Sequence, residues 1–136
     1  MRILFICTLI FCSLISHGQT VRTIEEITSK HKECLDSGID MLGCSRIYYS
    51  NMDSILNQVY NTLKSQLNVT EKERLKKEQK AWLKRRDVFI AKQNKEFLMK
   101  QKKGEWGSEM YMITYENDAE FVKERILILI KRLEKE

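Results

Sequence analysis

The chain has 136 residues, a formal net charge of +5 and no proline, and 43% of its residues are hydrophobic. This length allows one domain with a modest core and leaves little room for a second domain. Glycines are few, and runs that alternate apolar and polar residues are absent. These features predict an all-α fold, a small bundle of about four helices in which the third helix is long.

Residues 1–18 have the organisation of a signal peptide. Arg2 is followed by an apolar run over residues 3–15, and Ser16 and Gly18 supply the small residues that a signal peptidase requires. The run is shorter than the ~20 apolar residues that span a membrane. Cleavage after Gly18 is therefore expected, which makes the protein periplasmic or secreted and leaves no transmembrane segment in the mature chain.

A lipoprotein signal is less favoured than a cleaved secretory signal. Phe11 precedes Cys12, where a lipoprotein signal needs a small residue, and the apolar run continues past this point. The mature domain then covers residues 19–136, and its net charge is +4 because Arg2 is removed.

The first helix of the mature chain is predicted over about residues 21–35, and the second over about residues 44–67. Cys34 and Cys44 stand near the facing ends of these helices, and two cysteines in an exported chain are expected to form one disulfide. His31 is the histidine that remains after cleavage, so no metal site is expected. Its lysine neighbours favour an exposed polar side chain.

The third helix is predicted to begin with a capping box, with Thr70 as N-cap and Glu73 three residues later, and to run from Glu71 to about Lys103. Between Thr70 and Lys103, thirteen lysines or arginines stand against five acidic residues, which suggests an anionic partner. A helical wheel places most of this charge on a solvated face. Four candidate binding cations follow one strip of that face at four-residue steps, namely Lys72, Lys76, Lys80 and Lys84.

Some polar residues of the third helix lie instead on its apolar stripe, together with a tryptophan. If the second and third helices are antiparallel about a turn near Val69, facing residue numbers add to about 139. This register predicts a structural polar ladder inside the helix pair: Asp53 with Arg86, Asn57 with Trp82, and Tyr60 with Gln79. The Asp53–Arg86 ion pair is expected to be partly buried and to fix the register of packing.

The segment GEWGS, residues 104–108, is the clear loop after the long helix. Its Trp106 is either an exposed binding residue or a hydrophobic plug on the end of the bundle. The fourth helix is predicted from about Glu109 to the C-terminus. Its run ILILI, residues 126–130, is apolar on every side, so this helix either packs centrally or touches a partner subunit.

The motifs of the chain resemble a bacterial family. DSILNQVY (residues 53–60), QKAWLKRRD (residues 79–87) and a late Glu-Arg pair follow Cys34 and Cys44 in an order similar to the exported domain at the N-terminus of lysozyme inhibitor LprI. The resemblance covers about residues 30–130, nearly the whole mature chain. It implies the same helical domain, and its matching residues are interpreted as scaffold in the helix interior rather than as an inhibitory epitope.

The chain departs from this family at two positions. The family often has two further cysteines, and their places hold about Ile90 and about Asn117 or Asp118 here. Both are missing together, as expected if they pair with each other, so this chain keeps one disulfide of two. We therefore expect it to depend more on apolar packing between the third and fourth helices.

Two functions fit these features. The first is an exported binding protein that occludes the cleft of a lysozyme-type glycosidase, which contains two catalytic carboxylates. The lysine strip or Trp106 would contact the enzyme. The second is an envelope-associated protein that binds anionic polymers or lipid headgroups through the lysine strip, with an affinity that falls as salt rises.

Catalysis and nucleic-acid binding are not expected. After the expected cleavage, one histidine and no clustered carboxylates give neither an acid–base pair nor an activated nucleophile, so the sequence predicts no enzyme and no cofactor. Export disfavours nucleic acid as a partner. The sequence leaves the oligomeric state open.

Overall fold

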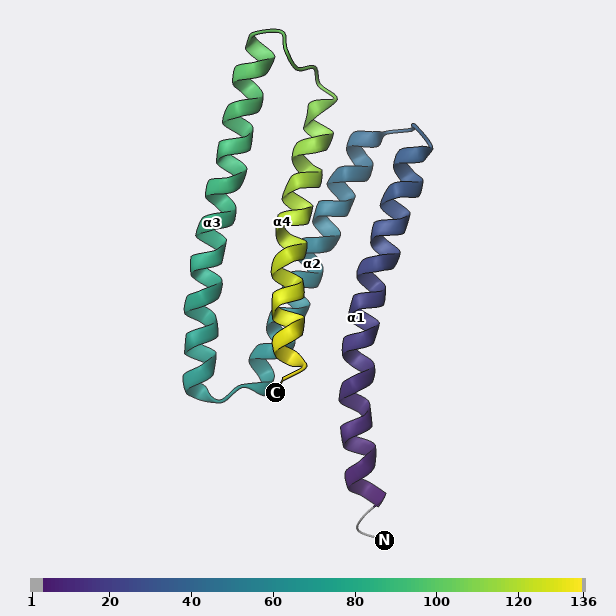
Figure 1. Ribbon diagram of the computed structural model, residues 1–136, viewed down its shortest axis with the longest axis vertical. Coiled ribbons are helices and arrows are strands. Elements are labelled where there is room, and N and C mark those ends of the chain that lie inside the picture. Colours follow the sequence, from purple (N-terminus) through teal and green to yellow (C-terminus); the bar gives the residue numbers. More distant parts are fainter. Residues whose placement is uncertain (1–3, 136) are drawn as a thin grey trace.

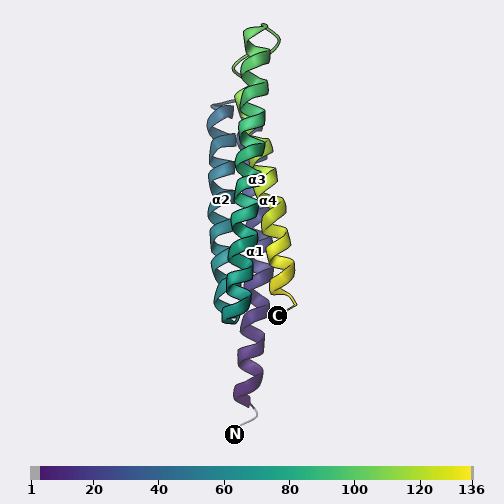
Figure 2. The ribbon, with the colours of Figure 1, turned by 90° about the vertical axis from the view of Figure 1, so that its left-hand side faces the viewer.

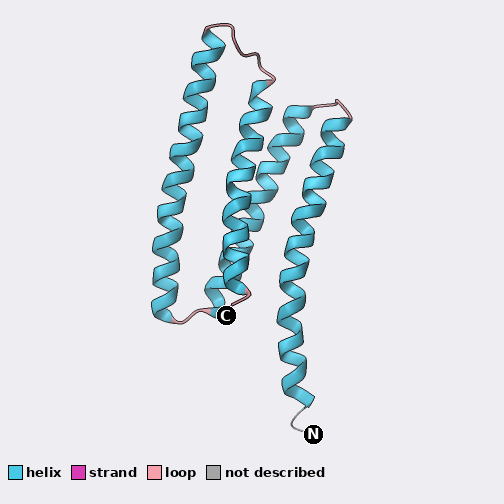
Figure 3. Ribbon diagram, viewed as in Figure 1, coloured by secondary structure: helices cyan, strands magenta, loops and turns pink. Residues whose placement is uncertain are grey.

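A computed structural model describes residues 4–135, with side chains described from Thr20 onward. Four helices run alternately up and down (Figure 1): α1 (Leu4–Asp36), α2 (Met41–Gln66), α3 (Val69–Lys102) and α4 (Met110–Leu133). Short loops join these helices, and the described range contains no strand (Figure 3). The predicted all-α bundle with a long third helix is confirmed.

α1 begins earlier than the predicted first helix, because its backbone stays helical through the expected signal peptide. The N-terminal part of α1 projects beyond the ends of the other helices (Figures 1 and 2). Residues 1–3 and the side chains before Thr20 lie outside what the structure describes, so cleavage after Gly18 stays a prediction. Over the described residues, none of the helices combines the length and apolar character that crossing a membrane requires.

The core lies mainly between α2 and α4. Both helices carry apolar residues at three- and four-residue spacing, and these side chains are almost completely buried: Met52, Leu56, Val59 and Leu63 from α2, and Val122, Ile126 and Leu129 from α4. α1 packs on α2, and α3 packs on α4. The ILILI run therefore belongs to a centrally packed helix, although Leu127 and Ile128 stay about half exposed.

The predicted Cys34–Cys44 disulfide is confirmed, with a Cα–Cα distance of 5.9 Å. It ties the end of α1 to the start of α2 across a tight turn. Asp40 adopts a left-handed conformation there (φ 46°) and caps α2 by accepting a hydrogen bond from the backbone N–H of Gly43 at 3.0 Å. A Cβ atom at residue 43 would meet the Asp40 carboxylate, so a larger residue there would displace this capping side chain.

α3 starts two residues earlier than predicted, and the capping box at Thr70 and Glu73 is wrong. Asn68 is the N-cap: its side chain accepts from the backbone N–H of Glu71 at 3.0 Å, and the Glu71 carboxylate accepts from the Asn68 backbone N–H at 3.2 Å. Asn is at least as good an N-cap as Thr, and Asn68 with Glu71 has the same spacing. Two overlapping boxes were available, and the earlier one forms.

Candidate functional site

A groove of about 280 Å³ lies between α2 and α3. The two helices are held apart because each packs on α4 rather than on the other. The groove is lined by residues from both predicted motifs and by two members of the lysine strip: Asp53, Leu56, Asn57, Tyr60, Lys76, Gln79, Lys80, Leu83 and Arg86. Most of the predicted polar ladder therefore faces an open groove instead of a closed helix interface.

The structure brings Asp53 and Arg86 together across this groove. The Arg86 Nη1 atom lies 3.4 Å from Asp53 Oδ1, and Nη2 lies 3.0 Å from Asp87 Oδ1 on the same helix. The guanidinium also stands over the Trp82 ring, 5.8 Å from its centroid. The side chains of Arg86 and Asp53 are 22% and 38% exposed, so the pair is partly solvated. Its role in fixing the helix register stays a prediction.

Gln79 is buried but bonds to α4 rather than to α2. Its Oε1 atom accepts a hydrogen bond from Arg125 Nε at 3.0 Å, and both residues are less than 10% exposed. Arg125 Nη2 is buried without a hydrogen-bond partner among the described residues. Burial lowers the pKa of the Arg125 guanidinium, and the nearby Glu78 carboxylate partly offsets this effect. Gln79 and Arg125 thus form a buried hydrogen bond between α3 and α4.

The other expected ladder pairs do not form. Trp82 is buried against α4, with its ring centroid 5.8 Å from that of Phe121. Asn57 is exposed and donates to the Asp53 backbone carbonyl at 3.0 Å. Tyr60 is half-buried on the groove wall, with Lys64 5.9 Å from its ring centroid. The expected register assumed that α2 and α3 pack directly, whereas α4 takes up the apolar faces of both.

The lysine strip follows the N-terminal half of α3. Lys76, Lys80 and Lys84 are exposed and Lys72 is half-buried. Lys76 and Lys80 border the groove, and Lys76 makes a long ion pair of 3.7 Å with Glu73. The strip therefore offers cations both to the groove and to the open surface of α3.

Trp106 lies far from the lysine strip, in the loop between α3 and α4. Its ring is half-buried, 6.2 Å from the Phe97 ring, with Lys100 Nζ 4.2 Å above it. From Lys84 to the end of α3 at Lys102, the helix rises about 27 Å at ~1.5 Å per residue. Trp106 thus covers the end of the α3–α4 hairpin, and it does not share a surface with the lysines.

Aromatic and polar contacts join α3 to α4 near Ile90 and Asn117, where the resemblance implied two further cysteines. Phe89 stacks on Phe121 at 4.6 Å. Gln93 donates to Asp118 Oδ1 at 2.7 Å and accepts from Asn117 Nδ2 at 2.8 Å. Burial raises the pKa of Asp118 to about 6, although the Gln93 hydrogen bond and the Arg86 charge act in the opposite direction. The expected apolar packing is therefore supplemented by a polar chain.

His31 is not the exposed residue that its neighbours suggested. Its side chain is 11% exposed and stacks on Tyr48, with ring centroids 4.3 Å apart. Its Nε2 atom lies 3.3 Å from Ser45 Oγ and 3.5 Å from Glu116 Oε1. Tyr48 in turn donates to Glu120 Oε1 at 2.6 Å, and burial followed by this hydrogen bond raises the pKa of Tyr48. The cluster ties α1, α2 and α4 together.

This Ser–His–Glu cluster does not have the geometry of a hydrolase triad. Ser45 Oγ and Glu116 Oε1 both approach the same ring nitrogen of His31, whereas a triad places the acid on the other nitrogen. Ser45 is also completely buried and donates to Glu116 at 3.0 Å. We assign these residues a structural role.

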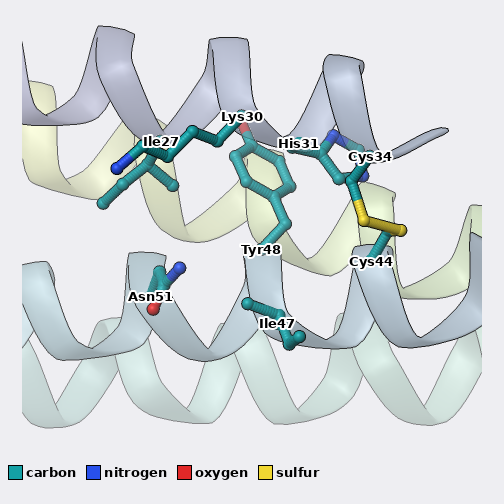
Figure 4. A pocket seen from close by; sticks show the side chains of 8 residues that line it. All are labelled: Ile27, Lys30, His31, Cys34, Cys44, Ile47, Tyr48 and Asn51. Atoms are coloured by element: carbon teal, nitrogen blue, oxygen red, sulfur yellow. A yellow bond between two sulfur atoms is a disulfide. The ribbon is translucent and has the colours of Figure 1, made fainter. Parts of the chain in front are cut away.

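A second pocket of about 230 Å³ opens between α1 and α2 beside this cluster (Figure 4). The disulfide and the rings of His31 and Tyr48 form part of its wall, and Lys30 and Asn51 lie at its side. The lining is mostly apolar, and the remaining members are Ile27 and Ile47. Sequence periodicity did not predict this pocket, because the pocket depends on the packing angle between α1 and α2.

The family model described as Lysozyme inhibitor LprI matches residues 30–129 of the chain. The matched range includes the end of α1, all of α2 and α3, and most of α4. Comparisons with curated proteins and with solved structures gave no match.

Proposed function

Because the chain belongs to the lysozyme inhibitor LprI family, we propose that the protein is an exported, non-enzymatic inhibitor that binds lysozyme-type glycosidases. The family match over residues 30–129 carries this proposal, since it includes most of the helical bundle. The resemblance to an exported domain and the signal-peptide pattern of residues 1–18 support the expected periplasmic or secreted location.

The lysine strip is the best candidate contact with the enzyme. Lys76, Lys80 and Lys84 project from one continuous helix, so their charges have fixed spacing without a flexible loop. A glycosidase cleft holds two carboxylates that attract such cations. Trp106 is less suited to this role because its ring already packs on Phe97 and Lys100.

A cell-wall lysis assay with the purified mature protein tests the proposal. We expect added protein to slow lysis by at least one lysozyme type. The variant Lys80→Glu/Lys84→Glu should weaken the protection on the order of tenfold, because it reverses two interfacial charges. Lys131→Glu is the control, since Lys131 is an exposed cation on α4. Undiminished lysis by several lysozyme types at a large molar excess of protein would remove the proposal.

A further inference from the structure

The groove between α2 and α3 has a surface suited to the ring of a small polar molecule. Leu56 and Leu83 supply apolar lining, and Tyr60 adds a half-buried aromatic ring from α2. Aromatic and apolar side chains with a few placed polar groups are the usual lining of small-molecule sites. A sugar ring has an apolar C–H face that fits such a surface, while its edge carries hydroxyl groups.

Polar atoms of the groove retain unused hydrogen-bonding capacity. Among the described residues, the Tyr60 hydroxyl and the carbonyl oxygen of the Asn57 side chain have no hydrogen-bond partner. A phenol can both donate and accept, and an amide oxygen accepts two hydrogen bonds. These groups and the partly exposed Asp53 carboxylate match the hydroxyl and amide groups of an amino sugar.

The charge of the groove favours an anion. Lys76, Lys80 and Arg86 line it against one carboxylate, that of Asp53. Arg86 is already shared between Asp53 and Asp87, whereas Lys80 has no ion-pair partner among the described residues. A cation at the rim of a partly enclosed groove attracts a negatively charged ligand and orients it.

We propose that this groove binds one anionic sugar unit, an acetamido sugar that carries a carboxylate. Its volume of about 280 Å³ is slightly below the ~300–1,000 Å³ typical of small-molecule sites. This space suits a single sugar ring whose neighbours continue into solvent. The expected association with anionic envelope polymers thereby becomes a defined site instead of a diffuse charged face. This inference goes beyond enzyme inhibition and does not depend on it.

Calorimetric titration of the purified protein tests the site directly. The probes are a disaccharide of N-acetylglucosamine and N-acetylmuramic acid, the neutral disaccharide of N-acetylglucosamine, and sodium acetate. We expect the carboxylated disaccharide to bind at least about tenfold more tightly than the neutral one, and acetate not to bind at the same concentration. Equal affinity for all three probes, or no binding of the carboxylated disaccharide, overturns the proposal.

Two lysines one helical turn apart provide a matched pair of variants. Lys80 lines the groove, and Lys84 is exposed outside it. Lys80→Glu should therefore weaken binding of the carboxylated disaccharide at least about tenfold, and Lys84→Glu should change it less than about twofold. Tyr60→Leu, which keeps an apolar side chain, should also weaken binding. Equal losses in the two lysine variants would overturn the site in favour of general charge attraction.

The same variants separate this site from the proposed inhibition. Enzyme binding through the lysine strip should weaken in both Lys80→Glu and Lys84→Glu, while the sugar site is sensitive to Lys80. The sugar titration contains no enzyme. A protein that binds the sugar without inhibiting any lysozyme would therefore remove the proposed function alone, and the reverse result would remove the sugar site alone.

Discussion

The Asp118 carboxylate is buried, and burial disfavours its charged form. Its pKa is about 6 in the folded protein, against an ordinary value of 3.8. Above pH 6 the Asp118 carboxylate is charged in both the folded and the unfolded chain. Burial of this charge in the folded chain lowers the free energy of unfolding. As the pH falls from about 6 towards about 4, the folded protein takes up a proton that the unfolded chain does not, so this group adds stability on acidification.

Replacing Asp118 with Asn should remove this effect. Asn keeps an oxygen that can accept the hydrogen bond from Gln93. We expect Asp118→Asn to raise the free energy of unfolding at pH 7.5 by roughly 1–3 kcal/mol. Urea unfolding at pH 7.5 and 4.5 measures the difference in free energy of unfolding between the variant and the parent. This difference should be smaller at pH 4.5. Asp36→Asn at an exposed site is the control. A variant no more stable than the parent at pH 7.5 contradicts the assignment.

The Asp53–Arg86 pair makes a smaller contribution, because both side chains are partly solvated. Arg86→Ala should lower the free energy of unfolding by about 1 kcal/mol, which corresponds to a fall in Tm of roughly 4 °C for a domain of this size. Thermal melts of this variant and of Arg85→Ala, an exposed neighbour, make the comparison. If Arg86→Ala melts within a degree or two of the parent, the pair does not hold the helices in register.

At the scale of helices, α3 and α4 are joined by the buried Gln79–Arg125 hydrogen bond. Gln79→Leu should cost about 2–4 kcal/mol, because it leaves a buried guanidinium without its Nε partner. The double variant Gln79→Leu/Arg125→Met removes both polar groups and should recover much of this loss. Chemical denaturation of the two single variants and the double variant gives the coupling. Strictly additive losses would show that the two residues act independently.

The Cys34–Cys44 bridge holds α1 to α2, together with the cluster around His31. Because the closed loop is short, Cys34→Ser/Cys44→Ser should lower the free energy of unfolding by roughly 2–3 kcal/mol. Amide hydrogen exchange should rise most in the C-terminal turns of α1. Reduction of the parent protein provides the control and should reproduce the result. Unchanged exchange in α1 would mean that the side-chain cluster alone holds this helix.

The helices and the disulfide could be predicted because local signals specify them. Apolar spacing gave the helix boundaries to within a few residues in α2, α3 and α4. Apolar spacing could not predict which helices pack against each other. The register argument was applied to α2 and α3, which are adjacent in sequence, whereas α4 packs on both. Asn57 and Tyr60 consequently line a groove instead of facing α3 in a closed interface.

The same register argument, applied to α3 and α4, predicts which residues of these two helices face each other. Gln79 meets Arg125 and Trp82 meets Phe121, and the residue numbers of these pairs add to 204 and 203. Phe121 and Arg125 are four residues apart, hence on one face of α4. His31 was harder to predict, because its partners Ser45 and Glu116 come from two other helices.

At the scale of the whole molecule, the packing of α4 against both α2 and α3 leaves two adjoining surfaces, which share Lys76 and Lys80. The central position of α4 opens the groove between α2 and α3, and it leaves the lysine strip exposed along α3. Trp106 closes the opposite end of α3. We propose a small anionic ligand for the groove and a larger anionic surface, such as an enzyme cleft, for the strip.

Direct binding to a lysozyme tests the central claim most directly. The purified mature protein is titrated against active lysozyme and against the same enzyme with its cleft blocked by a covalent inhibitor. Occlusion of the cleft predicts one-to-one binding to the active enzyme and its loss with the blocked enzyme. Equal binding to both forms, or no binding to any lysozyme in a panel of types, would contradict the claim.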